Sequence, residues 1–191
     1  MTEIDPREVP GDPLALHWVV RTGSQDVVGE VAAAPGPLGA LLEDRVVSLA
    51  LLETEGIWTW LAPGNTWADR TDEVREAIGE SLELDGWQIR DDSADLLRLI
   101  ANDVIDNDLA DFIEAADTTV EVIENDAHWL LLDLGRVDAR GPAASDELQL
   151  RIEVAIRARY PILREVSRVG GPESGQVGLA NAPRRALWTD G

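Results

Sequence analysis

Apolar and polar residues in the first half of the chain alternate between the spacing of strands and that of helices. Short apolar runs rich in β-branched residues predict strands at 13–20, at 45–52 and at 56–61, and a further extended segment through Val27, Val28 and Val31. The last two runs are separated by Glu53-Thr54-Glu55, which is hairpin spacing, so an antiparallel pair is expected.

Two helices are expected in the same half. One is short, at 38–44, and the other begins after Asn65 or Thr66 as its N-cap. The apolar face of the longer helix is indicated by residues at helical spacing: Trp67, Val74, Ala77, Ile78, Ser81 and Leu82.

The second half begins after residues 84–92, where glycine and aspartate break the helical pattern and a linker is expected. Ser93 is expected to cap a helix that runs to about Ala116, followed by a hairpin of strands at 118–124 and 127–134. Pro142 is expected to open a further helix, which Pro161 stops before a last strand at 162–169. The apolar face of that helix is marked by Leu148, Ile152, Ala155, Ile156 and Arg159.

These elements predict an α+β protein with two small α+β domains in tandem. The expected domains cover residues 10–84 and 93–169, and the glycine- and proline-rich residues 170–191 are expected to form a flexible tail.

The composition excludes several functions. There are 37 acidic residues against 16 basic ones, and the net charge of −21 disfavours nucleic acids and anionic membranes as partners. There is no cysteine, and every basic residue is an arginine, so thiolate chemistry, Walker A loops and lysine Schiff bases are ruled out. His17 and His128 are too few for a polyhistidine metal site, which leaves hard cations on carboxylates.

Targeting signals are missing from the sequence pattern. The acidic, proline-rich start lacks the basic and apolar regions of a signal peptide, and no apolar run approaches the roughly 20 residues that span a bilayer. A soluble cytoplasmic protein is expected, and its acidic composition is also typical of salt adaptation.

Several motifs in the second half carry a family resemblance. They are Ala115-Ala116-Asp117 before a strand, the strand end Leu134-Gly135, and Pro142-Ala143-Ala144-Ser145 opening a helix that ends in Tyr160-Pro161 before Arg164-Glu165-Val166. This half resembles the NifU-like C-terminal domain of the Nfu iron–sulfur carriers. Residues from Pro10 onward, with their proline-punctuated start, Pro-Leu helix, hairpin and closing helix, resemble the Nfu N-terminal domain.

The resemblance fails at the cluster-binding motif. In the family a C-x-x-C motif lies between the strand end and the proline, and here Asp138 and Gly141 occupy the cysteine positions. No thiolate is available, so the resemblance implies the fold without a cofactor and without a cluster-bridged dimer. A monomer or a cluster-independent oligomer is expected.

Three functions are considered. The first is a non-catalytic adaptor in iron–sulfur or hydrogenase-type assembly, which binds an apo iron–sulfur protein, a scaffold or a metalloenzyme subunit. The second is a stoichiometric structural subunit of a metalloenzyme complex. The third is a carboxylate-metal hydrolase, which would need acidic side chains that converge in a pocket.

Two segments are candidates for partner binding. Trp58 and Trp60 share one strand face, which forms either a partner platform or a surface buried beneath the helix that carries Trp67. The other segment combines charge with an aromatic anchor in Arg184, Arg185 and Trp188. Three alternatives are considered for it: docking on the protein's own acidic face, docking on a partner, or a disordered end.

Catalytic and metal motifs are not found. The acidic stretch from Asp106 to Asp117 lacks the turn glycine and the final glutamate of a calcium loop, so it is interpreted as a solvated helix face. His128 and Asp133 have opposite parity on one strand and should not pair. No enzymatic activity and no metal site are expected.

Overall fold

The computed structural model describes residues 3–20, 27–90, 93–135 and 141–170, which form an α+β protein with two sheets. The first sheet has the strand order β1-β2-β5-β4-β3-β6, and every neighbouring pair is antiparallel. Its strands are β1 (Ile4–Glu8), β2 (Ala15–Val20), β3 (Gly29–Ala33), β4 (Val47–Glu53), β5 (Gly56–Leu61) and β6 (Gln88–Arg90).

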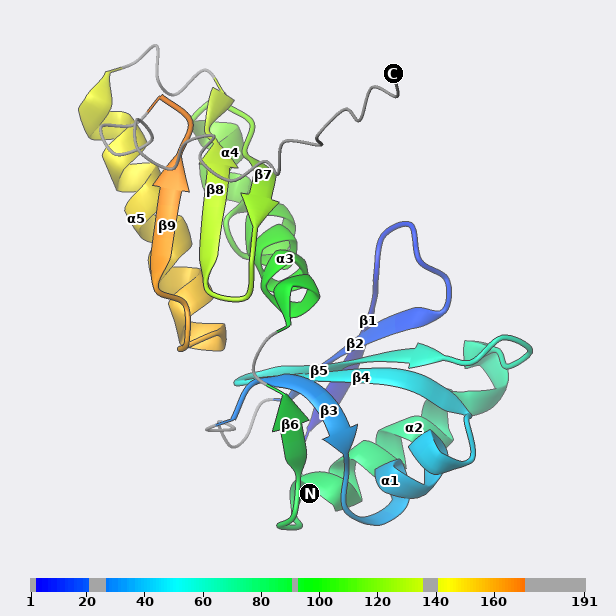
Figure 1. The fold of residues 1–191 in the computed structure, drawn as a ribbon. Helices are drawn as coiled ribbons and strands as arrows, with labels where there is room; N and C mark the ends of the chain where they lie inside the picture. The colour runs from blue at the N-terminus through cyan, green and yellow to red at the C-terminus, as the bar shows by residue number, and fades with distance from the viewer. Residues whose placement is uncertain (1–2, 21–26, 91–92, 136–140, 171–191) are drawn as a thin grey trace, which may run out of the picture.

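Two helices, α1 (Gly36–Glu43) and α2 (Trp67–Leu82), cover one face of this sheet (Figure 1). Strand alternation directs Ile57 and Leu61 to that face, where they pack with Val74 and Ile78 of α2. The expected hairpin and the expected apolar face of α2 are confirmed, and Thr66 is the N-cap residue.

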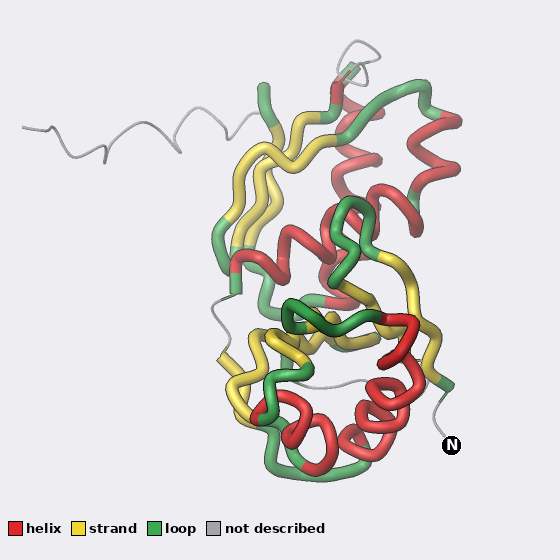
Figure 2. The backbone as a smooth tube through the Cα atoms, turned by 90° about the vertical axis from the view of Figure 1, so that its right-hand side faces the viewer, coloured by secondary structure: helices red, strands yellow, loops and turns green. Residues whose placement is uncertain are grey.

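The second sheet has the order β7-β8-β9, with β7 (Glu121–Asn125) antiparallel and β9 (Glu165–Arg168) parallel to β8 (Trp129–Asp133). Helix α5 (Pro142–Arg159) joins the two parallel strands. Before β7 the chain forms helix α3 (Ala94–Asp103), a π-helical turn η1 (Val104–Asp108) and helix α4 (Ala110–Ala115). These helices pack on one face of the sheet (Figure 2).

The expected order of helix, strand, strand, helix and strand is confirmed in this half. Ser93 caps α3 as expected, because its Oγ accepts a hydrogen bond of 3.2 Å from the Leu96 backbone N–H. The expectation of one continuous helix up to Ala116 is wrong, since η1 interrupts it.

The first sheet extends beyond the expected range 10–84 at both ends. Strand β1 pairs with β2 before residue 10, and β6 pairs with β3 inside the expected linker. The close approach of β6 requires Gly29, where φ is +147° and an added Cβ would lie 1.9 Å from the Arg90 carbonyl oxygen.

The apolar core continues across the junction between the two halves. Leu51 and Trp58 of the first sheet belong to the same buried cluster as Leu97 and Ile100 of α3 and Ile156 of α5. The C-terminal half therefore covers the sheet face opposite α1 and α2 (Figure 1).

The described part of the chain contains no helix with the length and apolarity needed to cross a membrane.

Candidate functional site

A group of buried ionisable side chains lies where α3 and α5 meet the first sheet. It consists of His17 on β2, Glu53 on β4, Asp103 at the end of α3 and Arg159 at the end of α5, and is called here the buried charge cluster. The Glu53 side chain is 0% exposed, and those of His17 and Arg159 are 4% and 5% exposed. Charges this deep in a protein require partners, and the cluster supplies them.

Glu53 is the centre of the cluster. Arg159 donates two hydrogen bonds to it, from Nε to Oε2 at 2.7 Å and from Nη2 to Oε1 at 2.8 Å, and Trp58 Nε1 donates a third to Oε1 at 3.0 Å. Burial raises the pKa of Glu53, but contacts with His17 and Arg159 outweigh that effect and lower the pKa from 4.5 to about 2. Glu53 is therefore a carboxylate at neutral pH.

His17 completes the environment of Glu53. Its ring stacks on Trp58 with a centroid separation of 4.0 Å and an angle of 6°, and its Nε2 lies 2.6 Å from Glu53 Oε1. This is an ion-pair distance, although the ring does not aim an N–H at the oxygen with hydrogen-bond geometry. Gly56 makes room for the ring, because a Cβ there would lie 2.9 Å from His17 Nε2.

The π-helical turn brings two carboxylates to Arg159. Arg159 Nη1 donates hydrogen bonds to Asp103 Oδ2 at 2.6 Å and to Asp108 Oδ2 at 3.4 Å. In an α-helix, two side chains five positions apart point in directions that differ by about 140° around the helix axis. Here the Leu109 N–H donates a 2.8 Å hydrogen bond to the Val104 carbonyl, five residues earlier, so this turn contains one residue more than an α-helical turn. Asp103 and Asp108 thus reach the same side of the helix.

The arrangement fits a structural contact between the first sheet and the C-terminal helices better than a catalytic centre. The Thr54 N–H also donates to the Arg159 carbonyl at 3.1 Å, which ties the β4-β5 turn to the end of α5. Two surface clefts, of about 570 and 440 Å³, are lined by other residues. Three side chains of the cluster are 0–5% exposed, and that of Asp103 is 10% exposed.

The sequence interpretation missed this cluster. Glu53 was assigned to the hairpin turn, and His17 was considered only as a metal ligand. The available signal was Arg159, which occupies a position in the apolar spacing of α5 and is consequently directed to the core.

Neither of the two alternatives considered for Trp58, a partner platform or burial beneath the helix that carries Trp67, agrees with its surroundings. Trp58 is 3% exposed, because α3 and α5 of the same chain cover it, and not the helix that carries Trp67. Trp60 does share its face, as expected, but it is half-buried and its Nε1 donates to Asp12 Oδ2 at 2.8 Å in the β1-β2 connection.

The positions that align with the family cysteines are only partly described. Asp138 lies outside the described residues, and Gly141 is the N-cap residue of α5. The smaller cleft, lined by Glu114, Asp117, Thr118 and Thr119, lies beside the strand end, where Thr118 Oγ1 donates to the Leu134 carbonyl at 2.7 Å. The described residues hold no group of three or more histidine, cysteine or acidic side chains arranged to bind a metal.

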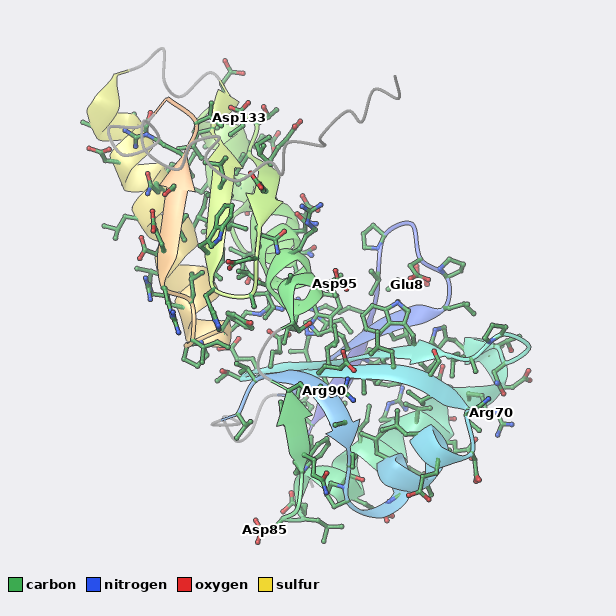
Figure 3. The ribbon with its side chains drawn as sticks, in the orientation of Figure 1. Glu8, Arg70, Asp85, Arg90, Asp95 and Asp133 are labelled. Carbon is green, nitrogen blue, oxygen red and sulfur yellow. The ribbon has the colours of Figure 1, made fainter. Side chains whose placement is uncertain are left out.

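The remaining sequence candidates are separated in space or not described. His128 precedes β8 and Asp133 ends it, so the two do not pair, and Asp133 lies at the end of the sheet far from the junction (Figure 3). In the acidic stretch, Asp108 contacts Arg159. Arg184, Arg185 and Trp188 lie outside the described residues.

A second surface of interest is the face of the β7-β8-β9 sheet that the helices leave uncovered, called here the open sheet face. Alternation places half-buried Trp129 and Leu131 at its centre, because Leu130 and Leu132 are directed to the core. By the strand register the carboxylates of this face are those of Glu121, Glu124, Asp133 and Glu165. An apolar centre with a polar rim is the usual composition of a protein-binding surface.

Comparisons with protein-family models, with curated proteins and with solved structures give no match.

Proposed function

We propose that this protein is a non-catalytic, cluster-free adaptor that binds a protein partner during iron–sulfur or metalloenzyme assembly. In this proposal its two halves are small α+β domains in tandem, an Nfu N-terminal-like one followed by a degenerate NifU C-terminal-like one. The order α-β-β-α-β of the second half and the strand end at Leu134-Gly135 support that assignment. The site that would carry chemistry in such a family contains no thiolate here.

The open sheet face is the observation that carries the proposal. Trp129 and Leu131 form an aromatic and aliphatic centre, and such side chains are enriched where proteins bind one another. The carboxylates around them favour a partner surface that is basic at its edges.

A permanent structural subunit is the second candidate, and one observation favours it. Leu150 and Val154 on α5 are each 60% exposed and lie one turn apart, so the C-terminal half has another exposed apolar stripe besides the open sheet face. Two separate contact surfaces are typical of a subunit held between neighbours. The carboxylate-metal hydrolase is not favoured by any group of side chains in the described ranges.

The cysteine-free chain allows a direct test by site-specific crosslinking. A Ser167→Cys variant places one thiol on the open sheet face, and an Ala158→Cys variant places one on the exposed side of α5, one turn after Val154, as a probe of the apolar stripe there. Each is labelled with a cleavable photo-crosslinker and irradiated in an extract of the native host. We expect the Ser167 variant alone to capture an apo metalloprotein or an assembly factor.

The outcomes separate the candidates. A partner captured only before metal insertion supports the adaptor, whereas a partner that stays bound at one-to-one stoichiometry in its metallated form supports the subunit. Equal capture by both variants, or capture of proteins unrelated to metal assembly, would overturn the adaptor.

The cluster-free part of the proposal has its own test. Anaerobic reconstitution with iron and sulfide should leave no protein-bound cluster, because no soft ligand is present. A stable visible charge-transfer band with stoichiometric iron would contradict it.

A further inference from the structure

We propose that residues Arg184–Trp188 of this chain bind the open sheet face of the same molecule and compete there with the protein partner. The charges and geometry of the open sheet face support the binding of the segment, while the competition rests on the proposed function.

Among the described residues, no ion pair compensates the negative charge of the open sheet face. Strands β7 to β9 place four carboxylates on it, and their only arginine, Arg168, is directed to the opposite face, where it donates to Asp146 at 2.7 Å. Within the described ranges none of the four carboxylates makes an ion pair. From the part of the chain that the structure describes, Asp133 accepts a hydrogen bond from the Gly135 N–H, and Glu165 accepts one from Ser167 Oγ.

The segment has the complementary composition. Arg184 and Arg185 are the only cations in residues 171–191, and they are followed closely by Leu187 and Trp188. Arginine matches carboxylate geometry with a planar fork of donors, and tryptophan can pack on Trp129 and Leu131. The order of charges and apolar residues in the segment thus matches a face with an apolar centre and an acidic rim.

The connection is long enough to reach the face. The Val169 N–H donates to the Leu132 carbonyl at 2.8 Å, so the chain leaves the sheet beside this face, and Val169 itself is 44% exposed. The 14 residues from 170 to 183 extend up to about 46–50 Å. A five-residue strand is only about 17 Å long, so the arginines can reach any of the four carboxylates.

Two alternative targets, the exposed side of α5 and a second copy of the chain, are less favourable. On the exposed side of α5, Glu147 already pairs with Arg151 at 2.9 Å and Glu153 with Arg157 at 2.8 Å, so little charge there remains to attract arginine. Binding to a second copy would bring together two chains of charge −21, whereas a tethered segment acts at an effective concentration in the millimolar range. The same molecule is therefore the favoured target.

Engineered disulfides in the full chain test the contact. Ser167→Cys combined with Thr189→Cys should form an intramolecular disulfide at least about tenfold faster than the control pair Ala158→Cys with Thr189→Cys, because docking raises the local concentration of one thiol near the other. Charge reversal with R184E and R185E should remove the difference. Raising the salt concentration from 0.05 M to about 0.5 M should reduce it, because the attraction is screened.

Three results would overturn the contact: equal rates for the two pairs, rates unaffected by charge reversal, or disulfide-linked dimers as the main product. The last would show that a second copy is the target. The competition is tested by crosslinking capture with Ser167→Cys, where the R184E and R185E changes in the full chain should increase partner capture several-fold, and unchanged capture would refute it. If the intramolecular disulfide forms but no partner is ever captured, the adaptor function fails while the tail contact stands.

Discussion

The buried ion pair of Glu53 and Arg159 contributes to stability only while both side chains are present and charged. A Glu53→Gln substitution keeps the shape but leaves the Arg159 guanidinium without its bidentate carboxylate at 5% exposure. We expect a loss of about 3–5 kcal/mol in the free energy of unfolding, as for other broken buried pairs, measured by chemical denaturation.

The matched control is Glu147→Gln, which breaks an exposed pair with Arg151. It should cost less than about 1 kcal/mol, because solvent screens that pair. Similar losses for the two substitutions would show that the buried charge cluster does not hold the halves together.

The pH dependence follows from the same residue. The pKa of Glu53 is about 2 in the folded protein against an ordinary 4.5, so its contribution to stability is fully present above pH 4.5 and is lost as the pH falls toward 2. That difference corresponds to about 3 kcal/mol. The stability gap between the wild type and Glu53→Gln, measured by denaturation from pH 7 to pH 2, should therefore close below pH 4.5, and a constant gap would contradict this assignment.

At the residue scale the sequence contained part of this site. Arg159 was placed correctly on the apolar face of its helix by spacing, which is unusual for an arginine and indicates a buried partner. Its partner Glu53 lies 106 positions earlier in the chain, and no local pattern links residues at that separation.

At the scale of elements, the β4-β5 hairpin determines which tryptophan is buried. Trp58 of β5 lies opposite Leu51 of β4 on one side and opposite His17 of β2 on the other. All three lie beneath the helices of the C-terminal half. A Trp58→Ala substitution should lower the melting temperature by about 6–20 °C, since aromatic truncation in a core costs about 3–5 kcal/mol.

Trp60→Ala is the comparison, because Trp60 is half-buried and bonded to Asp12. We expect a clearly smaller decrease in melting temperature, measured by circular dichroism. A larger effect of Trp60 than of Trp58 would contradict the burial described here.

The elements that escaped sequence-based prediction have weak local signals. Strand β6 has only three residues and forms because Gly29 lets it approach β3, while β1 contains Pro6, which a strand tolerates at a sheet edge. The π-helical turn η1 depends on Arg159 as the partner of Asp103 and Asp108, a contact between distant parts of the chain. By contrast, α2, α5 and the start of α3 agree with the sequence pattern, because the residues at helical spacing are also those that pack in the core.

At the scale of the whole molecule, the two halves share a core. Leu51 and Trp58 pack with the helices of the C-terminal half, and the buried charge cluster crosses the same junction. The mixture of helices and strands is predicted from the sequence, whereas this shared core is not, because it depends on which face of the first sheet the second half covers.

This junction predicts cooperative unfolding. The wild-type protein should show a single calorimetric transition whose calorimetric and van't Hoff enthalpies agree, because Leu51 and Trp58 of the first sheet are buried only beneath the helices of the C-terminal half. An Arg159→Ala substitution removes the cation between Glu53 and Asp103 and leaves two carboxylates buried at the junction, at 0% and 10% exposure, without it. Their repulsion and desolvation weaken the contact between the halves more than either sheet, so the calorimetric enthalpy should exceed the van't Hoff enthalpy as the two halves melt separately. Arg151→Ala, which removes an exposed pair with Glu147 and a contact with the Phe112 ring inside the C-terminal half, should keep the single transition. Two separate transitions already in the wild type would show that the halves are energetically independent, and the buried charge cluster would then hold them in place without coupling their stability.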